Sequence, residues 1–172
     1  MTYAEVVETW HDFYVTAGAA AATLVGLLFV GISLHIRLVA EHPEVRGLAR
    51  VTLADFFVVL LVSLGMLAPL GEIGAATWLI VVGLTTLRFI APPALDAVTH
   101  KHHQAVGSRL LLARFGASAL CCIGITATGL LFSAGRFNDA LAVLVIFTLL
   151  LLVVAVRNTW DLLVTVAMHR DR

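Results

Sequence analysis

From Phe13 to Leu34 the chain carries no charged side chain, no histidine and no proline. A helix of this length rises about 30 Å, which is the thickness of the hydrocarbon core of a bilayer. No basic residue precedes the stretch, and it is too long for the apolar region of a cleavable signal peptide. It therefore predicts a retained transmembrane helix, which makes lipid the expected solvent of the chain.

Composition extends this expectation to the whole chain. Of the 172 residues, 60% are hydrophobic and 13% are charged, and the mean hydropathy is +1.00. A water-soluble domain of this size cannot bury so large an apolar surface in one core. Positive and negative charges balance, so a nucleic-acid partner has no electrostatic support. We expect a single integral membrane domain over 1–172, surrounded by the lipid bilayer.

Five apolar segments are expected to cross the membrane as helices, because lipid offers the backbone no hydrogen-bond partner. Pro92 and Pro93 predict the end of the third segment, and the connection after them is expected to hold a short amphipathic helix. Residues after Arg157 are apolar at helical spacing, which predicts either a longer fifth helix or a helix lying on the membrane surface. The predicted fold is all-α, the five-transmembrane-helix bundle of a polytopic membrane protein. Its helices cover about 13–36, 51–70, 73–91, 110–133 and 138–166.

Basic residues are distributed unequally between the two sides that five spans define. Arg136 stands alone on the side of the N-terminus, and the other ten of the eleven lysines and arginines fall on the opposite side. Cytoplasmic loops of membrane proteins carry the excess of basic residues. We therefore expect the N-terminus outside and the C-terminus in the cytoplasm.

Small residues recur four apart along the first helix. Gly18, Ala22 and Gly26 form a ridge on which another helix can approach closely, and such packing drives helix association in lipid. Three uses remain open, namely packing within the bundle, self-assembly of copies, and lining of a pore. The fourth segment has a similar ridge that includes Ala117 and Gly129, so we expect the first and fourth helices to pack together.

Ionisable side chains gather near the predicted cytoplasmic ends of the helices. Asp55 lies about 7 Å beyond Arg50 along the second helix, and its side chain is too short to reach the headgroups as arginine does. An acid at this depth needs a partner or a water-filled pocket. One interpretation is an ion pair with an arginine that locks the helices together. The other is a polar vestibule for a proton, an ion or a polar solute, to which His35 would add pH sensitivity. The polar layer comprises His35, Arg37, Asp55, Arg88, Arg114, Arg157 and Asp161, of which Arg88, Arg114 and Arg157 are the candidate partners of Asp55.

Motifs for catalysis or metal binding are weak or missing. On a helix Asp96, His100 and His103 share one face that suits a divalent metal, and a solvated loop at the headgroups is the alternative. Cys121 and Cys122 are adjacent and imply no disulfide framework. The chain has no HExxH, GxSxG, P-loop, GxGxxG or GxGD motif. We expect neither an enzyme nor a bound cofactor.

The segments WHDFYVTAGAAAATLVGLLFVGISLHIRLV and RNTWDLLV resemble a family of small, uncharacterised bacterial membrane proteins common in actinobacteria. Its members have an N-terminal W-[HD]-x-F-[YF] lead, a Gly/Ala-rich first helix with GLxFV, and a W-D-L-L-V end. The resemblance extends along most of the chain. It implies a multi-pass protein of the bacterial cytoplasmic membrane and carries over no functional residue.

Two functions follow as expectations. The first is a non-enzymatic accessory or regulatory membrane protein, which acts with a membrane-protein partner and whose polar layer is structural. The second is a small homo-oligomeric ion or proton channel or transporter that uses the polar layer around Asp55. We favour the first, because the outer halves of the helices carry no polar side chains other than serine and threonine. A permeation path needs more than one polar layer.

Overall fold

The computed structural model describes residues 3–41, 43–99 and 107–170, and these residues form helices joined by short turns. The helices are α1 (Tyr3–Thr9), α2 (His11–Leu34), α3 (Ile36–Glu41), α4 (Pro43–Leu67), α5 (Gly71–Thr99), α6 (Gly107–Ser133) and α7 (Phe137–Arg170). Five of them, α2, α4, α5, α6 and α7, are long and apolar enough to cross a membrane. The predicted all-α bundle of five transmembrane helices is therefore confirmed.

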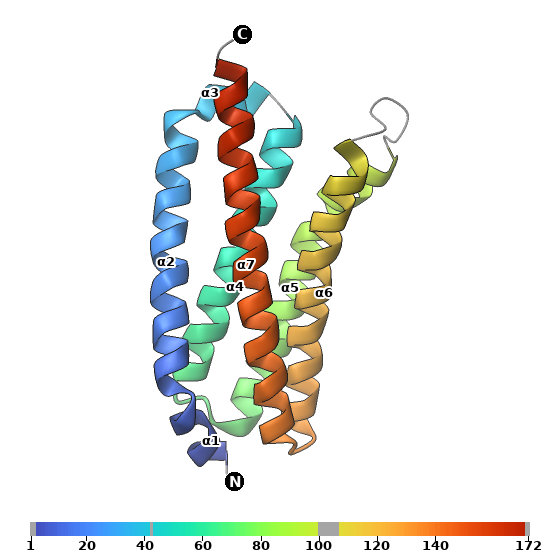
Figure 1. Cartoon of the computed structure of the whole chain (residues 1–172). Helices are drawn as coiled ribbons and strands as arrows, with labels where there is room; N and C mark the ends of the chain where they lie inside the picture. Colours follow the sequence, from blue (N-terminus) through green and yellow to red (C-terminus); the bar gives the residue numbers. More distant parts are fainter. Residues whose placement is uncertain (1–2, 42, 100–106, 171–172) are drawn as a thin grey trace.

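The five long helices run alternately up and down, so the two termini lie at opposite ends of the bundle (Figure 1). We call the end with the N-terminus and α1 the N-terminal end, and the other the C-terminal end. The turns between α4 and α5 and between α6 and α7 lie at the N-terminal end. Gly71 and Gly135 occupy these turns with φ of 66° and 73°, a left-handed conformation that glycine adopts without steric cost.

Helix α4 is the central helix of the bundle. It packs against α2, α5 and α7 and also touches α6. Most of the surface of α4 is buried, except for an exposed strip through Arg50, Phe57 and Leu64. Polar groups away from that strip are consequently enclosed by protein rather than lipid. The buried residues of α4 include Val45, Leu48, Val51, Thr52, Asp55, Phe56, Val59, Val62, Ser63 and Met66.

The first transmembrane helix, α2, packs mainly against α4. The expected packing of α2 against α6 is therefore wrong. Gly18 makes the close contact, since a Cβ built there would lie 3.0 Å from the Cβ of Ser63. Ala22 is exposed, and a Cβ at Gly26 would meet no atom within 4 Å. Packing of the ridge within the bundle is therefore right for Gly18 and wrong for Ala22 and Gly26, because the helix turns these two away from α4. The buried face of α2 runs instead through Tyr14, Ala17, Gly18, Ala21 and Leu28.

The small residues of α6 serve its contacts with α5 and α7. A Cβ at Gly129 would lie 2.8 Å from the Ala76 carbonyl oxygen of α5. Gly83 of α5 makes the reciprocal approach, where a Cβ would lie 2.9 Å from the Cys122 carbonyl oxygen. Glycine therefore brings the two backbones together, as expected for helices that associate in lipid.

Helix α5 is longer than the sequence predicts, and α7 follows one of its two predicted alternatives. Helix α5 continues through Pro92 and Pro93 to Thr99, so the predicted end of the helix is wrong, whereas its apolar span, Gly71–Ala91, agrees with the predicted 73–91. Residues 94–99 extend that helix instead of forming a separate one. Each proline removes one backbone donor, but its φ near −65° is helical, which allows the helix to continue. Helix α7 is one continuous helix past Arg157, so the predicted longer fifth helix is confirmed and the separate surface helix is wrong (Figure 1).

Candidate functional site

Asp55 is the acid that the sequence singled out. It lies on α4 and is completely enclosed by the bundle. Its exposed fraction is 0%. The Ser118 hydroxyl of α6 donates a hydrogen bond of 2.8 Å to its Oδ2, while its buried Oδ1 has no hydrogen-bond partner among the described residues. One neutral hydrogen bond therefore supports a carboxyl group that has been removed entirely from solvent.

The surroundings of Asp55 are apolar. Its neighbours Val51 and Ala54 belong to a buried cluster with Ile90 of α5 and with Phe115 and Cys122 of α6. A carboxylate in such a medium loses its hydration without a full set of replacement hydrogen bonds, which is expensive. The site consequently requires a compensating positive charge, either a proton or a cation.

Arg88 and Arg157 of the predicted polar layer do not provide that charge. Arg88 and Arg157 are exposed, and neither is ion-paired with Asp55. The predicted ion pair with either of these two arginines is therefore wrong, while the side chain of Arg114 lies outside the described residues. Arginine side chains are long enough to extend away from the helix that carries them, which removes them from the buried carboxyl.

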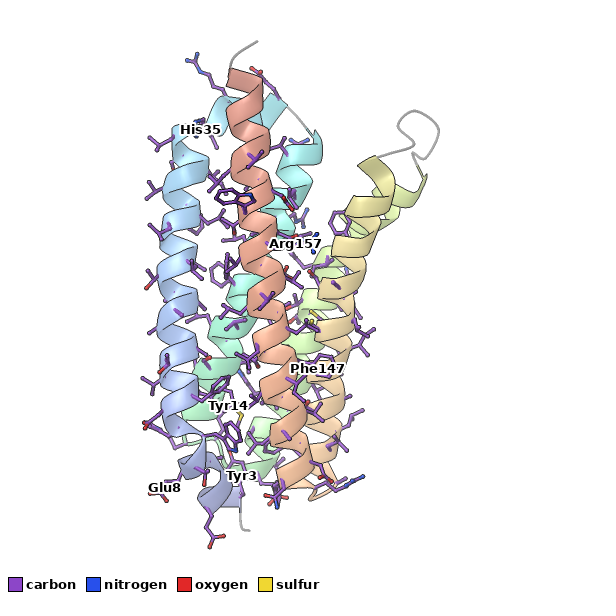
Figure 2. The ribbon with its side chains drawn as sticks, viewed as in Figure 1. Tyr3, Glu8, Tyr14, His35, Phe147 and Arg157 are labelled. Atoms are coloured by element: carbon purple, nitrogen blue, oxygen red, sulfur yellow. The ribbon has the colours of Figure 1, made fainter. Side chains whose placement is uncertain are left out.

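The other members of the polar layer are dispersed. His35 Nδ1 lies 3.2 Å from the Gly31 carbonyl oxygen of its own helix, at the C-terminal end (Figure 2). Arg37 is exposed, and Asp161 is partly buried on α7. The layer is thus a set of groups at similar depth and not one cluster around Asp55.

The side chains of the predicted metal motif lie outside the described part of the structure. Asp96 lies on α5 with its side chain outside the described part, and His100 and His103 lie outside the described residues. Among the side chains that are described, no group of three His, Cys, Asp or Glu could hold a metal ion. Cys121 and Cys122 are buried free thiols.

Four further polar groups are buried without a partner among the described residues, and the sequence did not identify them as a site. They are the Tyr14 hydroxyl, Ser63 Oγ, Thr148 Oγ1 and Asn158 Nδ2. Most buried polar groups in proteins are hydrogen-bonded, to protein or to ordered water. Thr52 and Thr128 follow this rule by donating to carbonyl oxygens of their own helices. For Thr148 and Asn158, the sequence signal that could have identified them is a seven-residue pattern of buried positions on α7. These positions are Leu141, Leu144, Thr148, Leu151, Ala155, Asn158 and Leu162.

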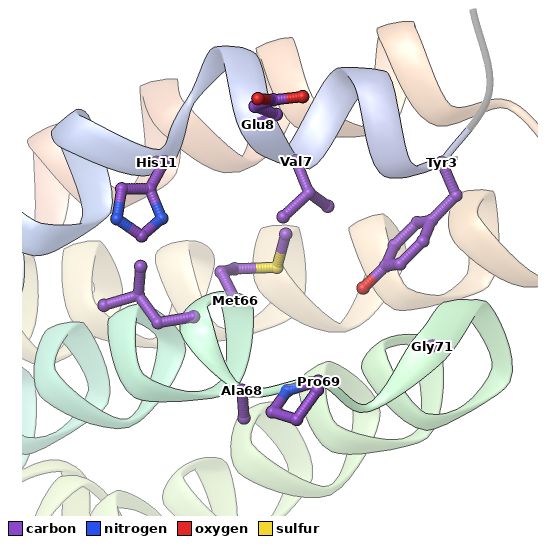
Figure 3. A pocket seen from close by; sticks show the side chains of 9 residues that line it. Tyr3, Val7, Glu8, His11, Met66, Ala68, Pro69 and Gly71 are labelled. Atoms are coloured by element: carbon purple, nitrogen blue, oxygen red, sulfur yellow. The ribbon is translucent and has the colours of Figure 1, made fainter.

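A pocket of about 330 Å³ opens at the N-terminal end of the bundle, between α1 and the turn from α4 to α5 (Figure 3). Burial raises the pKa of the Tyr3 phenol above its ordinary 10.0, and the nearby Glu72 carboxylate raises it further. The neutral phenol is therefore the form that folding favours, and this contribution to stability is lost as pH rises through the raised pKa. The pocket is lined by Tyr3, Val7, Glu8, His11, Met66, Leu67, Ala68, Pro69 and Gly71.

Comparison of the chain with protein-family models, with curated proteins and with solved structures finds no match.

Proposed function

We propose that this chain is a small, non-enzymatic multi-pass membrane protein that binds a proton at Asp55 and passes it across the membrane. The observation that carries the proposal is Asp55 itself, which is fully buried, bonded to a neutral serine, and left with one oxygen that has no partner among the described residues. Ionisable groups in such positions are typical of proton and ion pathways. The proposal takes the second of the two functions that the sequence allowed.

The accessory function depended on Asp55 acting as a structural lock. Asp55 has no cation beside it in the described part of the chain, and a buried acid in that state does not stabilise a fold, because an apolar residue of similar size avoids the cost of desolvation. Ser118 offsets only part of that cost, since a hydrogen bond contributes about 1 kcal/mol net. Retention of a costly acid in the bundle centre is better explained by chemistry that needs an acid.

A proton fits Asp55 better than a metal ion does. A divalent cation such as Ca²⁺ takes about six oxygen ligands or more. Near Asp55, the Ser118 hydroxyl is already bonded to Oδ2, and the Thr52 hydroxyl donates to the Leu48 carbonyl oxygen at 2.8 Å. A proton needs only the free carboxyl oxygen to neutralise the charge.

Apolar side chains of several helices pack against one another in the bundle centre. Ala21, Val62 and Leu151 all have exposed fractions of 0% and lie in the same core cluster. Packing of this kind favours transfer through protonation and deprotonation of fixed groups over flow through an open pore. It therefore supports a proton rather than a larger solute as the transferred species.

The proposal is tested by proton flux into liposomes that contain the purified protein and a pH-sensitive dye. With a potassium diffusion potential applied, we expect wild-type protein to acidify the lumen faster than protein-free liposomes. Asp55→Asn, which keeps the size of the side chain but cannot bind the proton, should reduce this added rate by about tenfold or more. Asp139→Asn is the matched control, because Asp139 is exposed and paired with Arg136 at the N-terminal end. Equal rates for wild type and Asp55→Asn, or no added rate for wild type, would contradict the proposal.

We also propose the bacterial cytoplasmic membrane as the location, with the N-terminal end outside. Arg136 lies at the N-terminal end, whereas Arg37, Arg46 and Arg50 lie near the opposite end, and basic residues favour the cytoplasmic side. Alkaline phosphatase fused at Gly135 should be active, since it folds only after export. A fluorescent protein fused after Arg172 should fluoresce, since it matures in the cytoplasm. The reverse result would assign the opposite orientation.

A further inference from the structure

Three of the buried groups without a partner are hydroxyls, and each comes from a different helix. Tyr14 of α2, Ser63 of α4 and Thr148 of α7 have exposed fractions of 1%, 0% and 1%, and their hydroxyl oxygens make no hydrogen bond to described residues. A hydroxyl enclosed in this way is costly unless water bonds to it. Three such hydroxyls in one half of the bundle indicate that water molecules bind there.

All three hydroxyls belong to the part of the core between Asp55 and the N-terminal end. Ser63 follows Asp55 by eight residues on α4, a rise of about 12 Å toward that end. Gly18 contacts Ser63, and Tyr14 lies one turn further out on the same face of α2. Thr148 lies between Leu144 and Leu151 on the buried face of α7, and both leucines share a core cluster with Tyr14 and Val62.

The pocket at the N-terminal end continues this series. Met66 lines the pocket and is also a member of the core cluster that contains Tyr14. His11 of the pocket precedes Tyr14 by three residues, and Met66 follows Ser63 by three, so one helical turn separates the pocket from the hydroxyls on both helices. Glu8 and His11 place titratable groups at the mouth (Figure 3), and Tyr14 lies just inside (Figure 2).

We propose that protons reach Asp55 from the N-terminal end, through the pocket and along water molecules held by Tyr14, Ser63 and Thr148. The inference rests on the proposed function of Asp55 and adds the route. In each transfer one O–H bond breaks and another forms. The last water gives its proton to the carboxylate and regains one from the hydroxyl or water before it, and bulk water at the pocket supplies the net proton.

Among the described residues, the three unpartnered hydroxyls all lie on the N-terminal side of Asp55. Cys121 and Cys122 of α6 are buried free thiols, and Cys122 belongs to the apolar cluster beside Asp55. On the neighbouring helices, Arg88 of α5 and Arg157 of α7 are exposed, and Arg50 of α4 stacks over the Phe89 ring at 4.0 Å. Asn158 of α7 is a polar group toward the C-terminal end, where it provides a control position.

The route is tested by infrared spectroscopy of the purified full-length protein in detergent. The carboxylic acid band of Asp55 is identified by its loss in Asp55→Asn, and its deuterium shift is followed after transfer to D₂O. We expect Tyr14→Phe, Ser63→Ala and Thr148→Val each to slow this exchange by about tenfold or more. Thr148→Ser, which keeps the hydroxyl, should exchange at the wild-type rate, as should Asn158→Leu.

The possible failures are distinguishable. If no acid band is lost in Asp55→Asn over the accessible pH range, Asp55 holds no proton and the proposed function is wrong. If the band is present but the three hydroxyl variants exchange at the wild-type rate, only the route is wrong. Slowed exchange in Asn158→Leu alone would also overturn the route, because entry would then be from the C-terminal end.

Discussion

Alanine at position 83 or 129 is expected to destabilise the bundle by about 3 kcal/mol, at the upper end of the usual cost of overpacking. At Gly83 a Cβ would overlap the Thr126 hydroxyl and lie 2.9 Å from the Cys122 carbonyl oxygen. At Gly129 it would lie 2.8 Å from the Ala76 carbonyl oxygen and 3.1 Å from the Ile80 nitrogen. Because backbone atoms cannot rotate away, relief requires α5 and α6 to separate along their contact.

Thermal or denaturant unfolding in one detergent measures this effect. Gly26→Ala is the matched control, because a Cβ there would meet no atom within 4 Å, and we expect its stability to stay within about 0.5 kcal/mol of wild type. Stabilities of Gly83→Ala and Gly129→Ala equal to that of Gly26→Ala would show that α5 and α6 do not approach this closely.

The second large effect is expected at Gly65, where α4 receives an aromatic side chain of α5. The Trp78 indole lies over this glycine, so a Cβ at position 65 would overlap the ring. Trp78 Nε1 also donates a hydrogen bond of 2.8 Å to the Leu61 carbonyl oxygen one turn earlier on α4. Gly65→Ala should displace the indole and break that hydrogen bond, at a cost of about 3 kcal/mol.

A double-mutant cycle separates this packing effect from a general intolerance of α4. The obstructing atoms at Gly65 all belong to one side chain, in contrast to Gly83 and Gly129. Gly65→Ala should therefore cost much less in a Trp78→Leu background, with a coupling free energy of about 2 kcal/mol. Additive effects of the two substitutions would contradict the contact between Trp78 and Gly65.

The number and approximate positions of the spans, and the identity of the key acid, could be predicted from local pattern. Length and hydropathy predicted the five spans, because lipid admits few structures other than helices of sufficient length. Depth alone singled out Asp55, since a short acidic side chain cannot reach the headgroups. Proline was misleading at Pro92 and Pro93, where the helix tolerates the lost donors and continues to Thr99.

The partners of those elements could not be predicted in the same way. The ridge of Gly18, Ala22 and Gly26 was assigned to one face, but only Gly18 contacts a neighbouring helix. Ser118 lies 63 positions from Asp55 and has nothing in its local sequence that marks it as the partner. Arginine was the expected partner on grounds of charge, and the tertiary arrangement brings a serine instead.

The sequence by itself determined that this protein is an all-helical membrane protein of five spans with one acid at an unfavourable depth. Only the tertiary structure decided which helix is central, which faces are buried, and which hydroxyls lie between Asp55 and the pocket. The physical reason is the solvent. In water, burial of apolar side chains marks the face of a helix that packs, but lipid accepts apolar side chains on every face. Packing in lipid is decided by close fit between helices, which is a property of two surfaces together.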